Sequence, residues 1–360
     1  MSILAGISIL IGLIVVYLTI IAFFPFKVEK QPIELKDSNG DVPTCRQDVT
    51  FKVNNLELSG WLYLPENSAG PVPCVVLNTG FCGTKDFLLE NYALSFVEAD
   101  FAALAFDYRH FGDSQGEPRQ IYSVSKQLED NKAVVSFARA RNEIDPEKIF
   151  IWGTSASGNY GIMLAAEDKQ IAGVIGQTPS LDHQAEGKMI VKRDGMGWFL
   201  KLIFHAQKDK IRSRFGLSSH TFPATGKPGT IAMLISPGIF EGYQKIAKGS
   251  KTFKNEVCAR IMLTLDEPNL LKSAEEVHCP VLFHLCEGDN LSLPDSHKKI
   301  EKILGKKVKF IKYPIGHFDI YFGEYFKKTI ADQISFITNI VHRSGDTFFN
   351  SNKQNTADKP

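Results

Sequence analysis

A serine at position 155 lies in a sequence that could make it a nucleophile. Ser155 stands in the segment Gly-Thr-Ser-Ala-Ser-Gly at 153–158, directly after the apolar run 149–152. Such a run predicts a buried strand that continues through a turn into a helix. Small residues around the turn allow a strained serine backbone to present its hydroxyl group. The usual pattern is G-x-S-x-G, whereas here Ser157 fills the last position and Gly158 follows it.

A serine hydroxyl needs a base that removes its proton, and His317 is the candidate. It follows a predicted strand and Gly316, which permits a sharp bend at the strand end. None of the other eight histidines of the chain follows a late strand in this way. His284 falls inside a predicted strand and is expected in the core, and the other seven are expected on the surface or in loops.

The third member of such a triad is a carboxylate that holds the imidazole ring. A predicted strand ends in the letters Cys-Glu-Gly-Asp, so Glu287 and Asp289 are the main candidates. Asp289 is preferred because Gly288 permits the bend that directs a short carboxylate towards His317. Glu287 is the alternative and still belongs to the strand end, and Asp295 is a more distant one. The resulting order of serine, aspartate and histidine is the one expected for an α/β-hydrolase.

Acyl chemistry also needs two backbone N–H donors that are already in place for the oxyanion. The N–H of Ala156, directly after the candidate nucleophile, is expected to be one of them. The other is expected from Phe81, in the loop Asn-Thr-Gly-Phe-Cys-Gly at 78–83. Its glycines allow the backbone to approach a substrate closely. An ordinary glycine turn would have the same letters.

Alternating strand and helix signals predict the scaffold for these residues. Strands are expected at 50–53, 56–64, 74–78, 102–106, 148–152, 171–176, 281–286 and 308–313, and helices at 87–98, 125–141, 156–166, 294–304 and 324–340. Repeated β–α units predict an α/β fold, with a mostly parallel sheet that helices cover on both faces. The first two strands form a hairpin that adds antiparallel strands at one edge.

Several motifs resemble the α/β-hydrolase superfamily over about residues 48–341. The letters Thr-Gly-Phe at 79–81 are similar to its H-G-F oxyanion loop, with threonine in place of histidine. The segment 106–114 resembles its D-x-R-G-x-G-x-S loop, with histidine where glycine is usual. In that loop the resemblance implies a structural ion pair between Asp107 and Arg109.

A closer resemblance is to bacterial and fungal hydrolases described as dienelactone-hydrolase-like or serine-aminopeptidase-like. It rests on four segments, at 153–158, 255–260, 286–289 and 316–324. The resemblance implies an α/β-hydrolase fold and a serine triad, and it names no substrate. Epoxide hydrolases and haloalkane dehalogenases of this fold use aspartate as the nucleophile, unlike Ser155. The dinucleotide, P-loop and zinc-protease motifs are absent from the sequence, so no cofactor is expected.

The β–α alternation breaks between about residues 183 and 276. An insertion there would lie over the carboxyl ends of the strands, so we expect a helical lid that shapes the substrate pocket. Trp198, Phe199, Leu202 and Ile203 share one helical face. This face either packs the lid onto the body or contacts an acyl chain or a membrane. Basic residues that would suit anionic headgroups surround it: Lys192, Arg193, Lys201, Lys208, Lys210, Arg212 and Arg214.

The composition narrows the class of protein. The 41 Lys and Arg residues nearly balance 40 Asp and Glu residues, for a net charge of +1. This balance excludes a broad basic face for nucleic acid, so no nucleic-acid partner is expected. Hydrophobic residues make up 44% of the chain, as in globular proteins. None of the six cysteines forms a C-x-x-C pair, so reduced and mostly buried thiols are expected.

The amino-terminal 27 residues predict a transmembrane anchor, because a helix of about 20 apolar residues spans a bilayer. A signal peptide is the alternative, but no basic residue precedes the apolar run and Phe-Phe-Pro-Phe at its end is a poor cleavage site. A buried core helix is a further interpretation. The polar segment 28–47 is expected to be a spacer, the hydrolase domain to cover 48–341, and 342–360 to be a flexible tail. Basic residues follow the helix, which favours a single-pass membrane protein with a cytoplasmic catalytic domain.

Two functions of different classes follow from these features. The first is a membrane-anchored serine hydrolase that cleaves an ester or thioester in a small-molecule or lipid-like acyl substrate. A peptidase or an acyltransferase with the same triad stays open. The second is a catalytically silent, membrane-tethered binding module, which is less favoured because all three triad positions are filled. The sequence does not specify an oligomeric state.

Overall fold

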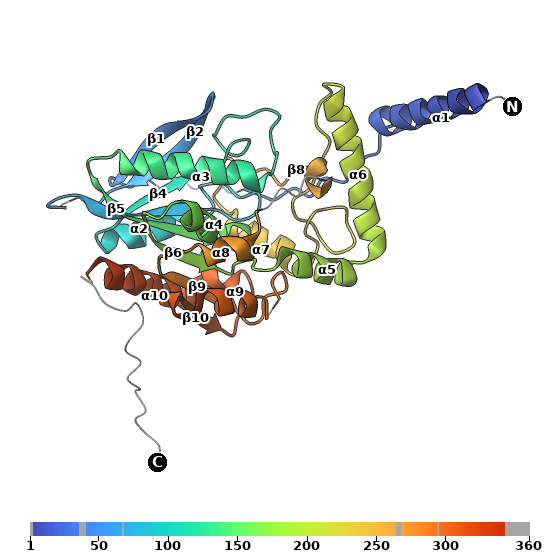
Figure 1. Ribbon diagram of the computed structural model, residues 1–360. Helices are drawn as coiled ribbons and strands as arrows, with labels where there is room; N and C mark the ends of the chain where they lie inside the picture. Colours follow the sequence, from blue (N-terminus) through green and yellow to red (C-terminus); the bar gives the residue numbers. More distant parts are fainter. Residues whose placement is uncertain (1–2, 36–40, 67, 264–267, 294, 343–360) are drawn as a thin grey trace, which may run out of the picture.

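The computed structural model describes residues 3–35, 41–66, 68–263, 268–293 and 295–342 (Figure 1). Within these residues, eight strands form one sheet. In spatial order they are β1 (Arg46–Val53), β2 (Leu56–Tyr63), β4 (Ala102–Phe106), β3 (Val72–Asn78), β5 (Ile144–Thr154), β6 (Ile171–Gln177), β9 (Val281–Cys286) and β10 (Val308–Tyr313). β2 runs antiparallel to β1 and β4, and the other neighbours are parallel. The expected α/β class is confirmed.

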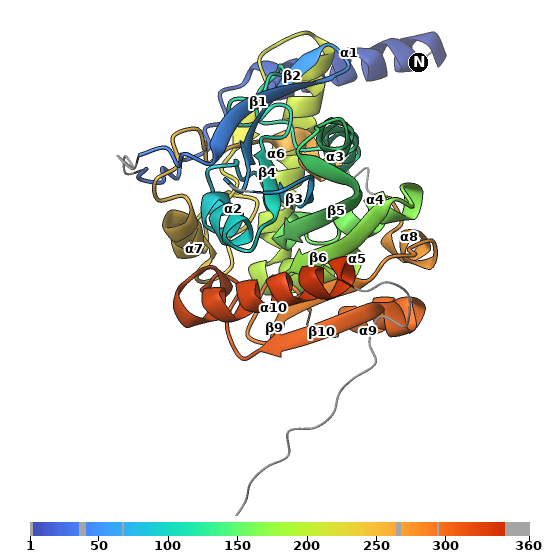
Figure 2. The same ribbon diagram turned by 90° about the vertical axis from the view of Figure 1, so that its left-hand side faces the viewer.

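Helices cover both faces of the sheet (Figure 2). One face carries α3 (Val124–Arg139), α4 (Tyr160–Glu167), α8 (Leu270–Glu275) and α9 (His297–Leu304), and the other carries α2 (Leu89–Glu98) and α10 (Gly323–Val341). Side chains alternate between the faces along a strand. In β5, Ile149 and Ile151 therefore join the core beneath α3 and α4, whereas Phe150 and Trp152 join the core beneath α2 and α10.

Residues 183–263 of the insertion lie beyond the carboxyl ends of the parallel strands (Figure 1). The insertion contains α5 (His183–Asp194), α6 (Met196–Arg214), β7 (Thr221–Phe222), α7 (Ile239–Ile246), β8 (Val257–Cys258) and the short 3₁₀ helix η2 (Ala259–Leu263). Arg193 holds it to the body by donating to the carbonyl of Asn290 at 2.6 Å. Its last helix, α8, packs against α4 and α9 instead, because Leu270 and Ala274 belong to the core of the body.

The first helix, α1 (Ile3–Phe23), projects away from the body (Figure 1). Its segment Ala5–Phe23 has a mean hydropathy of 2.7 and is long and apolar enough to cross a membrane. Only 11% of this segment is buried, so the interpretation as a core helix is wrong. The chain after α1 packs against the insertion, where Asn255 donates to the carbonyl of Gln31 at 2.7 Å. All six cysteines are free, and all except the half-buried Cys45 are buried.

Candidate active site

Ser155 lies on a sharp turn between β5 and α4. Its φ of +55° is in the left-handed region that a side chain rarely adopts. The turn is tight because a Cβ at Gly153 would clash with the carbonyl oxygen of Ser157, and one at Gly158 would lie 2.7 Å from Cα of Pro179. The chain leaves β5, makes the 3₁₀ helix η1 (Ser155–Ser157) and enters α4. Ser155 is left half-exposed at the carboxyl edge of the sheet.

Ser157, where the usual pattern has glycine, holds this turn in place. Its Oγ accepts from the backbone N–H of Thr154 at 3.1 Å. The same hydroxyl lies 3.0 Å from the carbonyl oxygen of Asn78 and 3.1 Å from that of Thr154. The extra hydroxyl is therefore accommodated, and it ties the serine turn to the end of β3, from which the predicted oxyanion loop continues.

The structure brings Ser155, His317 and Asp289 together. His317 Nε2 lies 3.1 Å from Ser155 Oγ, and its Nδ1 lies 2.6 Å from Asp289 Oδ2. The side chains of the histidine and the aspartate are only 4% and 3% exposed. The other two candidate acids lie elsewhere: Glu287 is exposed at the end of β9, and Asp295 pairs with a lysine of α9 at 2.9 Å.

Asp289 is held as a charged acceptor. Its Oδ1 accepts from the backbone N–H groups of Leu291 at 2.7 Å and Ser292 at 3.3 Å. Burial would raise the pKa of Asp289, but the charge and hydrogen bond of His317 and the two backbone donors outweigh burial and lower it below its ordinary value. An ionised carboxylate favours the tautomer with the proton on Nδ1, which leaves Nε2 of His317 able to accept a proton.

The loop with the second expected oxyanion donor lies against Ser155. Gly80 to Gly83 form a turn closed by a 3.1 Å bond from Gly83 N–H to the Gly80 carbonyl, with Cys82 at a φ of +54°. A Cβ at Gly80 would lie only 3.2 Å from Cβ of Ser155, so glycine permits this approach. In the described part of the chain, the N–H groups of Phe81 and Ala156 donate to no backbone acceptor of a loop or turn. Ala156 directly follows the serine and Phe81 follows Gly80, which lies against it, so the two predicted donors lie beside Ser155.

Helix α7 of the insertion supports this turn from the opposite side. The hydroxyl of Tyr243 donates to the carbonyl of Phe81 at 2.8 Å, and the tyrosine is buried. Its neighbour Gly242 lies so close to Phe318 that a Cβ would clash with the ring. α7 therefore contacts both the oxyanion loop and the residue next to His317. Sequence reasoning missed Tyr243, because it lies where the β–α rhythm is broken and no motif surrounds it.

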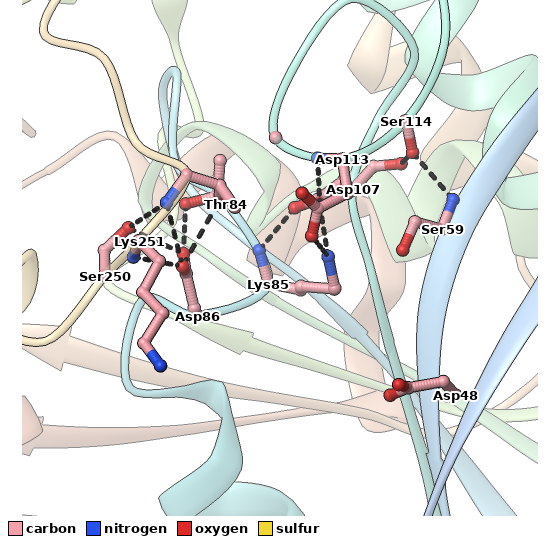
Figure 3. Close-up of polar contacts among 12 residues, drawn as sticks. Asp48, Ser59, Thr84, Lys85, Asp86, Asp107, Asp113, Ser114, Ser250 and Lys251 are labelled. Atoms are coloured by element: carbon pink, nitrogen blue, oxygen red, sulfur yellow. Dashed lines mark hydrogen bonds and ion pairs between the residues drawn. The ribbon is translucent and has the colours of Figure 1, made fainter. Parts of the chain in front are cut away.

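A buried ion pair holds the chain after the turn (Figure 3). Lys85 Nζ lies 2.6 Å from Asp107 Oδ2 and 2.7 Å from Asp113 Oδ2. Burial would lower the pKa of Lys85, but the two aspartates outweigh it and raise the pKa. The expected pairing of Asp107 with Arg109 is wrong. Arg109 turns to α3, where it pairs with Asp130 at 2.6 Å, because Asp107 already accepts from Lys85 on the opposite side.

The next residue, Asp86, joins the same loop to the insertion (Figure 3). Its carboxylate accepts from Ser250 Oγ at 2.8 Å and from the backbone N–H of Lys251 at 2.8 Å. Thr84 Oγ1 also donates to it, at 2.5 Å. The oxyanion loop is thus anchored to β4 through Lys85 and to the insertion through Asp86 and Tyr243. Among the described residues, no three His, Cys, Asp or Glu side chains are grouped to hold a metal ion.

The mostly parallel sheet, the covering helices and the serine on its strand–helix turn define an α/β hydrolase. Residues 70–318 match the family model of serine aminopeptidase, S33. The chain belongs to this family.

Two relatives and a solved structure are similar over different lengths. The quorum-quenching protein AidA of Acinetobacter baumannii is 35% identical over 305 residues, which cover 84% of this chain and 98% of AidA. Thiohydrolase aneE of Aspergillus aculeatus is 36% identical over 138 residues, 38% of this chain and 42% of that protein. The structure of DcsB with a substrate analogue superposes with a TM-score of 0.70 at 24% identity, covering 83% of this chain and 100% of that chain. At this identity the superposition shows the fold alone.

Proposed function

We propose that this chain is a membrane-anchored serine hydrolase that cleaves an ester or thioester through an acyl-enzyme. The observation that carries the proposal is the position of His317, whose two ring nitrogens lie 3.1 Å from Ser155 Oγ and 2.6 Å from Asp289 Oδ2. In this role Ser155 is the nucleophile, His317 the general base and acid, and Asp289 the group that orients the imidazole.

In the acylation step, Ser155 Oγ attacks the substrate carbonyl carbon while its proton passes to Nε2 of His317. The carbonyl oxygen becomes an oxyanion, which the N–H groups of Phe81 and Ala156 would stabilise. The imidazolium then gives the proton to the leaving alkoxide or thiolate, and the bond from carbon to the leaving group breaks. The ionised Asp289 stabilises the positive charge on the ring while it lasts.

In the deacylation step, water replaces the departed alcohol or thiol. His317 removes a proton from the water, whose oxygen attacks the acyl carbon of the ester on Ser155. The second oxyanion collapses, Ser155 Oγ takes back the proton, and a carboxylic acid leaves. The same groups thus act twice, with no other reactant than water.

The relatives support an activated acyl substrate. One is named a thiohydrolase, which supports a thioester as well as an oxygen ester for this chain. Another is named a quorum-quenching protein, which supports a small diffusible or membrane-permeable substrate. A panel of p-nitrophenyl esters, acyl thioesters and lactones of increasing chain length would identify the acyl group. A product formed only when an alcohol or amine acceptor is added would identify an acyltransferase instead.

A fluorophosphonate probe tests the nucleophile directly. The full chain in detergent should be labelled at Ser155, as shown by mass spectrometry of the labelled peptide, and Ser155→Ala should abolish labelling and hydrolysis. Ser292→Ala is the matched control, because only its backbone N–H contacts Asp289 and that group remains. Absence of labelling in folded wild-type chain would contradict the proposal and support a silent binding module.

The anchor is tested separately. α1 is proposed to remain on the mature protein and to hold it in the membrane, with the catalytic domain on the cytoplasmic side. The intact mass of protein purified from membranes should include residues 1–27, and alkaline carbonate should not release it. A shorter mass that lacks this segment would identify a signal peptide.

A further inference from the structure

The end of α1 is bound to helix α6 of the insertion. Arg212 donates to the carbonyl of Ala22 at 2.9 Å, and Lys208 donates to the carbonyl of Phe24 at 2.7 Å. The last carbonyls of a helix lack partners within it and attract cations. The rings of Phe26 and Phe204 meet edge to face at 4.6 Å. The apolar helix and the insertion therefore form one packed junction.

α6 runs across the end of α1 and does not lie alongside it (Figures 1 and 2). A helix of 21 residues is about 31 Å long, close to the thickness of the hydrocarbon core of a bilayer. If α1 spans the bilayer, α6 lies along the membrane surface. Tyr17 contacts Gln207 of α6 at 3.3 Å. Because Tyr17 lies about 9 Å before the end of α1, this places α6 at the depth of interfacial helices.

One face of α6 continues from this junction into open solvent. The positions on this face recur every three or four residues: Met196, Leu200, Phe204, Gln207 and Ile211. The second half of the face lies at the junction: Phe26, just after α1, packs on Phe204, Tyr17 of α1 contacts Gln207, and Tyr17 and Ile211 line one pocket. In the first half, Met196 and Leu200 are 59% and 58% exposed, and Phe215 at the far end of α6 is 64% exposed. Because Met196 and Leu200 share a helical face with Gln207, which Tyr17 of α1 contacts, they point to the side on which α1 lies.

The charges of α6 match an anionic surface. The helix has five basic residues and one acid, Asp209, which is buried and paired with Arg260 at 2.6 Å. Among the described residues, Lys201, Lys210 and Arg214 form no ion pair. Basic residues beside exposed apolar ones are typical of helices that lie among anionic lipid headgroups.

We propose that α6 is a membrane-interface platform that binds the anionic lipid headgroups of the leaflet from which α1 emerges. The platform consists of Met196, Leu200, Lys201, Lys210, Arg214 and Phe215. This proposal rests on the membrane anchor of the proposed function, and it narrows the substrate class of the proposed hydrolase. The insertion that carries α6 also carries Tyr243 against the oxyanion loop. Because the insertion lies beyond the carboxyl ends of the strands, where Ser155 follows β5, α6 places the active site on the membrane side of the domain (Figure 1). Its substrate is then an amphiphilic acyl compound that partitions into the membrane.

The depth of α6 is measured on the full chain reconstituted in vesicles. Leu200→Cys carries a bimane label, and vesicles with doxyl-labelled lipid quench bimane that enters the interface. Ser335→Cys is the control, because Ser335 is exposed on α10, which lies on the other side of the body from α6 (Figure 1). Bimane labelling of the unsubstituted chain gives the background from the native cysteines. With phosphatidylglycerol in the vesicles, quenching at position 200 should be at least about twofold stronger than at position 335.

The attraction between the platform and anionic headgroups is tested by removing the positive charges of the platform. The triple change Lys201→Gln, Lys210→Gln and Arg214→Gln should reduce quenching at position 200 to the level found in phosphatidylcholine vesicles. The matched control removes the same charge from exposed lysines on the body, by Lys302→Gln, Lys306→Gln and Lys328→Gln, and should leave the quenching unchanged.

Three results would overturn the platform. Equal quenching at positions 200 and 335 would place α6 in water. Protection of position 200 that grows with the protein-to-lipid ratio would identify a second copy as the partner. Loss of α1 from the reconstituted chain would remove the anchor and the platform together. Fluorophosphonate labelling of Ser155 in the same vesicles keeps these outcomes separate from a failure of the catalytic proposal.

Discussion

The hydroxyl of Tyr243 is expected to position the oxyanion loop, and Tyr243→Phe removes only that hydroxyl. The variant leaves the carbonyl of Phe81 buried without its 2.8 Å donor. A buried polar group without a partner costs about 1–3 kcal/mol. The turn can avoid part of this cost by shifting, and a shift moves the N–H of Phe81 away from the oxyanion. Loss of the Tyr243 hydroxyl is therefore expected to weaken stabilisation of the transition state by displacing the backbone N–H of Phe81.

The magnitude follows from two limits. Complete loss of one oxyanion donor lowers kcat by about 10²–10³-fold. Tyr243→Phe only loosens the donor, so about 1.4 kcal/mol, or roughly tenfold in kcat, is expected. KM should change little, because the donor acts on charge that develops in the transition state.

The assay is steady-state hydrolysis of a p-nitrophenyl ester, with thermal unfolding measured on the same samples. Tyr122→Phe is the matched control, since its ring packs on Phe81 at 4.9 Å while its hydroxyl bonds to Tyr160. It should keep kcat within about twofold, because the hydroxyl that it removes bonds to Tyr160. An unchanged kcat in Tyr243→Phe with a lower unfolding temperature would refute the positioning role. A higher KM with unchanged kcat would show that the hydroxyl binds substrate instead.

Three further predictions follow from the site and its supports. Asp289→Asn should lower kcat by roughly 10⁴-fold, as tautomer-disrupting changes do, whereas the exposed Glu287→Gln should cost less than about tenfold in the same assay. Asp107→Asn should lower the free energy of unfolding in denaturant by about 3–5 kcal/mol, because it leaves the buried charge of Lys85 without its main partner; a loss below about 1 kcal/mol would contradict this. Burial lowers the pKa of His284 to about 3, and a nearby lysine adds to the effect. Below about pH 6.5 the unfolded chain therefore binds a proton at His284, whereas the folded chain does not. Stability should therefore fall as pH falls, by about 1.4 kcal/mol per pH unit between pH 6 and 4, and His284→Gln should remove one proton from that dependence.

Local patterns were sufficient for most of the scaffold. β4, β9 and β10 have the bounds expected from their apolar runs, because buried parallel strands are continuous apolar segments whatever surrounds them. The turn at Ser155 was also readable from small residues between a strand and a helix. The preference for Asp289 over Glu287 followed from the glycine between them, and the structure places only Asp289 against His317.

Contacts between distant segments were not readable in the same way. Asp107 pairs with Lys85, 22 residues earlier, and not with the nearby Arg109, because the strand order places the loop after β3 beside the loop after β4. His205 and His297, expected on the surface or in loops, are buried in helices. The partner of Asp107 and the burial of the two histidines both depend on how the helices and strands pack. Spacing along the chain does not encode that packing.

The sequence by itself thus determined the α/β class, the order of the elements and the residues at the strand ends, because each depends on local apolar patterning and turn chemistry. Only the tertiary structure decided that Tyr243 supports the oxyanion loop and that α6 packs across the end of α1. The physical reason is the same for both. The insertion lacks a repeating β–α pattern. The positions of its helices therefore depend on the shape and charge of the surfaces against which they pack, and not on a local sequence pattern.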